Sequence, residues 1–354
     1  MNDSAAQPVP SPDEIQQAAR RLLEGGLVAF PTETVYGLGA DAENPQAVAR
    51  IYTAKGRPAN HPVIVHISPE GDPAYWAAEV PPQARKLMQA FWPGPLTLIL
   101  KRAPRIPDAV SGGQDSIGLR CPSHPVAQAL LRAFAALKPG GQGGVAAPSA
   151  NKFGQVSPTR AEHVRNEFPE EVAQGMPVLD GGASEVGIES TILDLSRLDQ
   201  GAGAVLLRPG HIGAAQIEGV LGEPVHRPDA AAPRASGTLK AHYAPHTPLE
   251  LIDDARLARL ARGLDLPEGR AALVIYTALP ELPPSVAARL HVHAVPADPA
   301  HYAQALYGTL RELDRGGFAR LLAQAPPRTP QWDAVNDRIG RAAAAFMLDT
   351  EGLD

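Results

Sequence analysis

Apolar residues recur along the first part of the chain at the spacings of helices and of short strands. Ser11, Pro12 and Glu14 form the pattern of a capped helix start, and apolar side chains then mark one face as far as Gly25. Further helices are expected at 44–54, 82–91 and 124–134, and after Ser157. Short apolar runs predict strands at 27–30, 63–67, 96–101, 116–120, 145–147, 190–195 and 204–207, with 31–39 as a loop. Since several strands follow one another directly, we expect an α/β fold with a mixed, strongly twisted sheet.

The pattern breaks between residues 222 and 248, where prolines recur and predict a linker or an extended arm. A second α/β unit follows, with expected strands at 249–252 and 271–276 and expected helices near 256–263, 301–314 and 332–347. In the last helix we expect Arg338 and Arg341 to point outward and to have no chemical role. The predicted organisation is a flexible N-terminus, a main domain, the arm and a small domain, at 1–10, 11–221, 222–248 and 249–354.

Composition narrows the class of protein. The chain has 354 residues, which is enough for two domains, and 44% of them are hydrophobic. It has no apolar stretch of the roughly 18–20 residues that a membrane-spanning helix needs, and its start lacks the pattern of a secretory signal. The single cysteine, Cys121, fits a reducing compartment, so we expect a soluble cytoplasmic protein without a membrane partner. With 32 basic and 38 acidic residues, the chain lacks the basic excess of a dedicated nucleic-acid binder.

Common signatures of nucleotide, metal and covalent chemistry are absent or incomplete. The chain has no P-loop motif and no nucleophile elbow, and Gly37-Leu38-Gly39 is only half of a dinucleotide fingerprint. The glycines at 140–144 precede an expected strand, which is the wrong order for a phosphate cradle. His291 and His293 are too isolated for a metal site.

Cations, hydroxyls and an amide instead stand beside the ends of several expected elements. A lysine offers a point charge and an arginine a bidentate fork for phosphate or carboxylate. Taken singly, each residue is also explained as a solvated charge or an ordinary turn. Together they favour an anionic, phosphate-bearing ligand, because ligands of α/β sheets collect where strand ends converge. The residues concerned are Lys55 with Arg57, Ser149 with Asn151, Arg120, and Arg208.

Several motifs carry a resemblance that covers nearly all of residues 11–248. They lie at 31–39, 55–67, 92–97, 116–122, 147–151 with 157–159, 187–195, 206–210 and 242–245. In these stretches the chain resembles the threonylcarbamoyl-AMP synthases in their long two-domain form. The resemblance implies a YrdC-like catalytic domain with a twisted mixed sheet and helices, followed by a smaller Rossmann-like α/β domain. It also implies synthesis of threonylcarbamoyl-adenylate from L-threonine, bicarbonate and ATP, with release of pyrophosphate.

The resemblance also assigns residues to two subsites. Lys55 and Arg57 would be catalytic, Arg120 would take the carboxylate of threonine, and Tyr243 in the arm would close over the nucleotide. This chain has His61 where the family usually has asparagine, and 236–239 differ from the family's arm motif. The implied ATP contacts are Lys55, Arg57, His61, Ser116, Ser149, Asn151, Ser157, Arg208 and Tyr243. The implied threonine contacts are Thr34, His66, Arg120, Ala147, Ser190 and Thr191.

The implied reaction needs alignment, charge stabilisation and exclusion of water rather than a nucleophilic side chain. We expect Mg²⁺ to arrive on the ATP phosphates, without a metal cage built by the protein and without a tightly bound organic cofactor. The expected partners are proteins that transfer threonylcarbamoyl to tRNA adenosine beside the anticodon, with at most a weak contact to tRNA itself. Two alternatives stay open: a carbamoyl-adenylate-forming enzyme that uses carbamoyl phosphate, and a non-enzymatic RNA-binding module.

Overall fold

The computed structural model describes residues 9–347 and divides the chain into two compact units. The first unit comprises Met1–Phe153 and Ser157–Thr238, and the second comprises Gly154–Val156 and Leu239–Asp354. Most of the expected flexible N-terminus, together with the last seven residues of the expected small domain, 348–354, lies outside the described residues. The division between the units falls within the expected arm.

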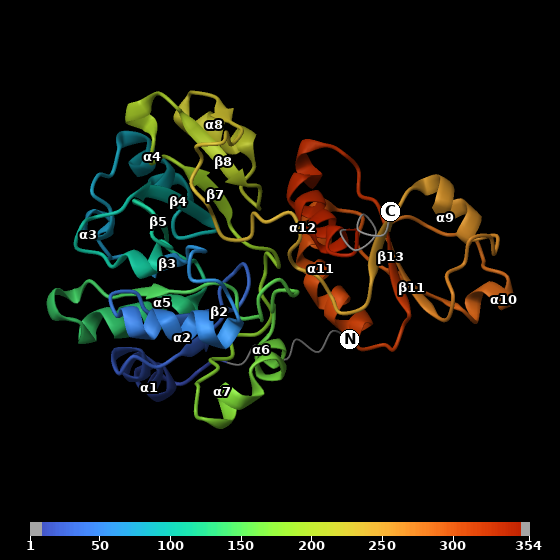
Figure 1. Ribbon diagram of the computed structural model, residues 1–354, viewed down its shortest axis with the longest axis horizontal. Coiled ribbons are helices and arrows are strands. Elements are labelled where there is room, and N and C mark those ends of the chain that lie inside the picture. The colour runs from blue at the N-terminus through green and yellow to red at the C-terminus, as the bar shows by residue number, and fades with distance from the viewer. Residues whose placement is uncertain (1–8, 348–354) are drawn as a thin grey trace. The chain divides into compact units, whose positions relative to one another are not determined.

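A mixed sheet forms the centre of the first unit, with the strand order β1-β2-β6-β3-β5-β4-β7-β8-β9 (Figure 1). The pairs β3/β5, β4/β7 and β8/β9 are parallel, and the other neighbours are antiparallel. This arrangement confirms the expected mixed sheet. The strands are β1 (Val28–Phe30), β2 (Gly37–Asp41), β3 (Ile64–Ile67), β4 (Leu96–Lys101), β5 (Ser116–Arg120), β6 (Gly144–Ala146), β7 (Thr191–Asp194), β8 (Ala204–Arg208) and β9 (Val225–His226).

Helices cover this sheet, and the first of them begins as the sequence predicts. The backbone N–H of Ser11 donates to Glu14 Oε2 at 2.8 Å, and Ser11 Oγ accepts from the Glu14 N–H at 3.3 Å. Apolar side chains of α1 then pack with α5 and with Phe30 in one core cluster. The helices are α1 (Pro12–Leu23), α2 (Pro45–Lys55), α3 (Pro73–Trp76), α4 (Pro82–Phe91), α5 (Pro125–Leu137), α6 (Ala161–Glu167), α7 (Pro169–Ala173) and α8 (Ala214–Leu221).

Two local predictions for the first unit are wrong. Part of the expected loop at 31–39 is strand, because Gly37 pairs with Phe30 and Gly39 with Val28 across the antiparallel β1/β2 ladder. A side chain on Gly39 would approach Val145 Cγ1 to 2.7 Å, so this strand position requires glycine. Ser157 does not cap the next helix. That helix begins at Ala161, and the hydroxyl of Ser157 instead donates to Glu189.

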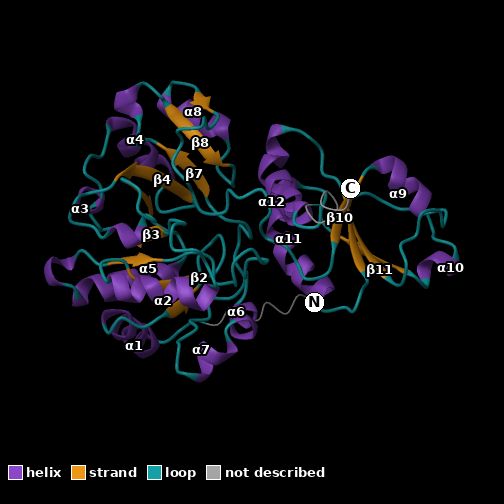
Figure 2. Cartoon of the chain, viewed as in Figure 1, coloured by secondary structure: helices purple, strands orange, loops and turns teal. Residues whose placement is uncertain are grey.

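The second unit has a parallel sheet with the order β10-β13-β11-β12 and helices on both faces (Figure 2). Leu257 and Leu260 of α9 and Val286 of α10 pack in its core. This architecture confirms the expected small α/β domain, although the sequence did not predict the central strand β13. The elements are β10 (Leu249–Ile252), α9 (Asp254–Leu260), β11 (Ala271–Ile275), α10 (Pro284–Ala287), β12 (Leu290–Ala294), α11 (Pro299–Asp314), β13 (Arg320–Gln324) and α12 (Asp333–Ala344).

The expected outward position of Arg338 is wrong, because this side chain is fully buried. Its guanidinium lies 5.5 Å from the ring centroid of Tyr243, and it pairs with Asp337 at 2.6 Å. Arg341 is mostly buried as well, with its side chain 21% exposed, and it donates to the carbonyl of Leu239. Helix α12 therefore holds residues 239–243 of the arm within the second unit. Among residues 9–347, no helix is long and apolar enough to cross a membrane.

Candidate active site

Arg120, the last residue of β5, is held by groups from two loops of the first unit. Its Nη1 donates to Thr34 Oγ1 at 2.8 Å, and its Nε donates to the carbonyl of Gly94 at 3.3 Å. Its Nη2 lies 2.7 Å from Oε1 of Glu33, and the two charged side chains are only 4% and 5% exposed. The structure thus brings Arg120 and Thr34 together as expected for one subsite. Sequence reasoning missed Glu33, whose position between two threonines gave no separate signal.

A chain of hydroxyl groups fixes which hydrogen bonds Thr34 can make. Thr32 Oγ1 lies 2.6 Å from the carbonyl of Val35, and this acceptor takes its single hydrogen. The contact of 2.8 Å between the two threonine hydroxyls is therefore donated by Thr34. Because the hydrogen of Thr34 is committed to Thr32, Thr34 Oγ1 can offer a ligand only an acceptor lone pair.

His66 lies beside Arg120 in the parallel β3/β5 ladder and is buried. Burial, reinforced by the nearby Arg120 charge, lowers the pKa of His66 to about 3, so the ring is neutral at physiological pH. Among the residues that the structure describes, His66 Nδ1 has no hydrogen-bond partner. Ala147 follows β6, and its N–H donates to the carbonyl of Ile64 in β3.

Ser190 and Thr191 are bound within the framework around β7. Ser190 Oγ lies 2.8 Å from Thr97 Oγ1, and the carbonyl of Ser190 accepts from Arg208 Nη2 at 2.8 Å. Thr191 Oγ1 donates to the carbonyl of Ile212 at 2.8 Å. Arg208, at the end of β8 and an expected ATP contact, is thereby bonded directly to Ser190, an expected threonine contact.

Lys55 joins two of the expected motifs. Its Nζ donates to the carbonyl of Ser149 at 2.6 Å and to the carbonyl of Asn151. Burial, followed by the charge of Arg57, lowers the pKa of Lys55 well below its ordinary value. The Lys-x-Arg and Ser-x-Asn segments, which are almost a hundred residues apart in the sequence, therefore meet at one ammonium group.

Gly56 lets the chain turn from α2 to Arg57. It caps the helix with φ at +62°, a left-handed conformation that favours glycine. Arg57 then donates through Nη2 to the carbonyl of Pro62 at 2.8 Å, and its guanidinium lies 5.7 Å from the ring centroid of Phe153. The expected contact residue His61 lies edge-on to the same ring, at 5.3 Å between centroids.

Ser236 lies in the part of the arm that belongs to the first unit, and it connects Arg57 with Arg208. Arg57 Nη2 donates to its Oγ at 3.4 Å, and Arg208 Nη1 donates to its carbonyl at 2.8 Å. Ser116 and Ser236 also line the same small hollow in the first unit. The structure therefore gathers Arg57, Ser116 and Arg208 around Ser236, which sequence reasoning had not assigned to the site.

Tyr243 belongs to the second unit, where its surroundings are well defined. Its backbone is left-handed, with φ at +65°, and its ring centroid lies 5.7 Å from that of Tyr307. The N–H of the following residue, Ala244, donates to the carbonyl of Gly154 at 2.9 Å. The expected closure of Tyr243 over a nucleotide stays a prediction.

Comparisons with known proteins decide the family. A family model described as "Telomere recombination", which covers Sua5, YciO and YrdC proteins, matches residues 20–210. A second, described as "Threonylcarbamoyl-AMP synthase, C-terminal domain", matches residues 212–344. The chain belongs to the threonylcarbamoyl-AMP synthase family. The recognition from sequence motifs is thereby confirmed, and it extends through the C-terminal domain.

Individual relatives match over nearly the whole chain. The threonylcarbamoyl-AMP synthase of Bacillus subtilis (strain 168) is 37% identical over 353 residues, which are 95% of this chain and 94% of the relative. That of Pyrococcus abyssi is 35% identical, with 95% of each chain covered. A crystal structure of P. abyssi Sua5 complexed with L-threonine superposes with a TM-score of 0.81 and 34% identity, covering 96% of each chain. This match confirms the YrdC-like domain and the smaller second domain.

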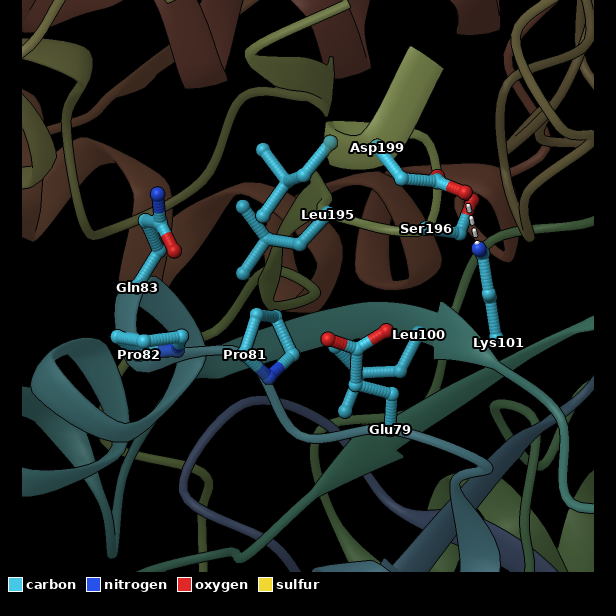
Figure 3. A pocket seen from close by; sticks show the side chains of 10 residues that line it. Glu79, Pro81, Pro82, Gln83, Leu100, Lys101, Leu195, Ser196 and Asp199 are labelled. Carbon is cyan, nitrogen blue, oxygen red and sulfur yellow. Dashed lines mark hydrogen bonds and ion pairs between the residues drawn. The ribbon is translucent and has the colours of Figure 1, made fainter. Parts of the chain in front are cut away.

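A separate hollow of about 270 Å³ lies between β4 and the segment after β7 (Figure 3). An ion pair of 2.6 Å between Lys101 and Asp199 stands at one side of it. Of the described residues that line this hollow, none belongs to the expected site. Within residues 9–347, no group of three His, Cys, Asp or Glu side chains is arranged to hold a metal ion.

Proposed function

We propose that this member of the family makes threonylcarbamoyl-adenylate from L-threonine, bicarbonate and ATP and releases pyrophosphate. The observation that carries the proposal is the meeting of Lys55 with both Ser149 and Asn151, because it assembles the family's two nucleotide segments around one ammonium group. Arg120, buried beside Thr34, supplies the separate cation that an amino-acid carboxylate needs. The crystal structure of the P. abyssi relative complexed with L-threonine supports threonine as the substrate.

The chemistry requires positioning more than covalent help from the protein. Threonine's amine and bicarbonate or CO2 give a carbamate, whose oxygen attacks the α-phosphorus of ATP as pyrophosphate leaves. Arg120 and Thr34 would orient the threonine, while Arg57 and Arg208 would stabilise phosphate charge. Cys121 is unsuited to act as a nucleophile, because burial raises the pKa of its thiol to about 12.

Besides its expected catalytic role, Lys55 has a structural role in this proposal. With two of its three N–H donors directed at the carbonyls of Ser149 and Asn151, it fixes the shape of the loop that carries their side chains. Mg²⁺ would enter with the ATP phosphates and neutralise part of their charge. Cations and hydroxyls suit this arrangement, since the metal brings its own oxygen ligands from phosphate and water.

Further parts of the assignment follow from the family. We place the product upstream of threonylcarbamoyl transfer to tRNA, carried out by separate proteins in the cytoplasm. The ATP contacts proposed at His61, Ser116, Ser157 and Tyr243 belong to the same assignment, as do the threonine contacts at His66, Ala147, Ser190 and Thr191.

The proposal is tested by pyrophosphate release from ATP and Mg²⁺, with L-threonine and bicarbonate omitted in turn. Release should require both substrates. Release that instead requires carbamoyl phosphate would contradict the proposal in favour of a carbamoyl-adenylate-forming enzyme. Folded protein that releases no pyrophosphate, but binds tRNA with a steep salt dependence, would favour the RNA-binding alternative.

A further inference from the structure

Glu33 is a buried acid placed against the cation that would receive the substrate carboxylate. Its Oε1 lies 2.7 Å from Arg120 Nη2. Its other oxygen, Oε2, accepts from the backbone N–H of Ser123 at 3.2 Å, which holds the carboxylate in place. Among the described residues, neither Glu33 Oε1 nor Arg120 Nη2 has a hydrogen-bond partner of good geometry, although the two atoms are in ionic contact. Two opposite charges are thus buried together and in direct contact with each other.

The other polar groups beside Arg120 are neutral or already committed. Thr34 donates to Thr32, so its hydroxyl can only accept. Gly94 contributes a carbonyl that already accepts from Arg120 Nε. Glu33 is accordingly the negative charge that balances Arg120 in this part of the first unit.

This balance has a consequence for the ligand. A carboxylate ligand that has no amine would be repelled by Glu33 as it approached Arg120, because Glu33 Oε1 lies 2.7 Å from Nη2 of that arginine. A free α-amino acid carries an ammonium group next to its carboxylate, so it can satisfy both charges at once. A ligand with a single charge would add an unbalanced charge to this buried site, which costs free energy. A zwitterion adds no net charge to the site.

We propose that Glu33 and Arg120 together recognise the zwitterion of a free α-amino acid, with Glu33 accepting the α-ammonium group while Arg120 binds the carboxylate. This inference rests on the proposed function, since it assumes that threonine binds at Arg120. It makes Glu33 a residue that determines specificity: the site selects amino acids with a free amine over the same acids without the amine.

The inference is tested by calorimetric binding to the full chain and to Glu33→Gln. The ligands are L-threonine and (R)-3-hydroxybutyrate, which has the same carbon chain and hydroxyl but lacks the amine. Wild type should prefer threonine strongly. In Glu33→Gln, threonine should bind about tenfold or more weakly, because a charge-assisted hydrogen bond is lost. The hydroxy acid should bind at least as tightly as it binds wild type, because the repelling charge is gone.

The opposite sign for the two ligands separates recognition from a structural role. If Glu33 only orients Arg120, both ligands lose affinity together in Glu33→Gln, and the inference is overturned. It is also overturned if wild type binds (R)-3-hydroxybutyrate as tightly as threonine, a result that does not depend on the variant folding. If wild type binds threonine but Glu33→Gln binds it equally well, the inference fails and the proposed function stands. Pyrophosphate release that does not require threonine would instead remove the function itself.

Discussion

At the scale of single residues, the site is built from buried charges that are bound by backbone carbonyls or by an opposite charge. Lys55 is bound by two carbonyls, Arg57 by Pro62, and Arg120 by Glu33. The sequence predicted that these cations belong to the site, because lysine and arginine side chains bind phosphate and carboxylate groups. It did not predict Glu33 or Ser236, because an acid or a serine becomes informative only when the fold places it beside a cation.

Replacing Arg57 should impair use of ATP. Arg57→Ala removes a guanidinium expected on the phosphates, so we expect a loss of at least ~2 kcal/mol in transition-state stabilisation, measured as kcat/KM for ATP. Arg105→Ala is a matched control, because Arg105 also lies over an aromatic ring, that of Tyr75, at 5.0 Å but outside the site. The control should keep wild-type kinetics, and an Arg57 variant that did the same would refute the role.

The buried His66 should make stability depend on pH. Its pKa falls from 6.5 in the unfolded chain to about 3 in the folded protein. The stability contributed by neutral His66 is therefore complete above pH 6.5 and is lost as the pH falls towards 3. Between pH 6.5 and pH 5, wild type should lose about 2 kcal/mol more unfolding free energy than His66→Gln, measured by denaturant titration. Equal losses in the two proteins would mean that His66 titrates normally.

At the scale of elements, the sequence predicted well those helices and strands whose apolar period is clear. The strands β4 and β5 match the expected ranges, as do the start of α1 and the existence of α2, α4 and α5. It failed where tertiary pairing decided the structure. The strand at Gly37 to Asp41 depends on its partner β1, and β13 is a central strand that only its parallel neighbours reveal.

Helix α12 shows the same limit in the second unit. Its charged residues have the spacing of an exposed face, yet Arg338 is buried because the arm lies against it and offers the ring of Tyr243. Arg341 meets the same segment at the carbonyl of Leu239. The burial of Arg338 could not be read from the helix alone, since its cause lies almost a hundred residues earlier.

Removing Arg338 should loosen the arm and destabilise the second unit. Arg338→Met loses the contact with Tyr243 and the ion pair with Asp337, which keeps its ion pair with Arg341, so we expect a loss of about 2 kcal/mol in unfolding free energy. Denaturant unfolding measures this change. Arg259→Met is the control, because Arg259 forms an exposed ion pair with Asp265 and should cost less than about 1 kcal/mol. Similar losses in the two variants would contradict a clamping role.

At the scale of the whole molecule, the chain passes between the two units at three points, namely 153/154, 156/157 and 238/239. The arm passes from the first unit to the second between Thr238 and Leu239. Residues 154–156, which lie between Asn151 and Ser157 in the sequence, pack within the second unit, where Arg311 donates to the carbonyl of Val156. Two expected ATP contacts, Asn151 and Ser157, therefore flank in the sequence a segment that belongs to the second unit.

In the proposed reaction, the first unit joins threonine, bicarbonate and the adenylate of ATP. The most direct measurement is mass spectrometry of the product made from ATP, Mg²⁺, L-threonine and ¹³C-labelled bicarbonate. We expect an adenylate that carries threonine and one labelled carbon, and that disappears when threonine is omitted. An adenylate without threonine, or with an unlabelled carbamoyl carbon, would contradict it.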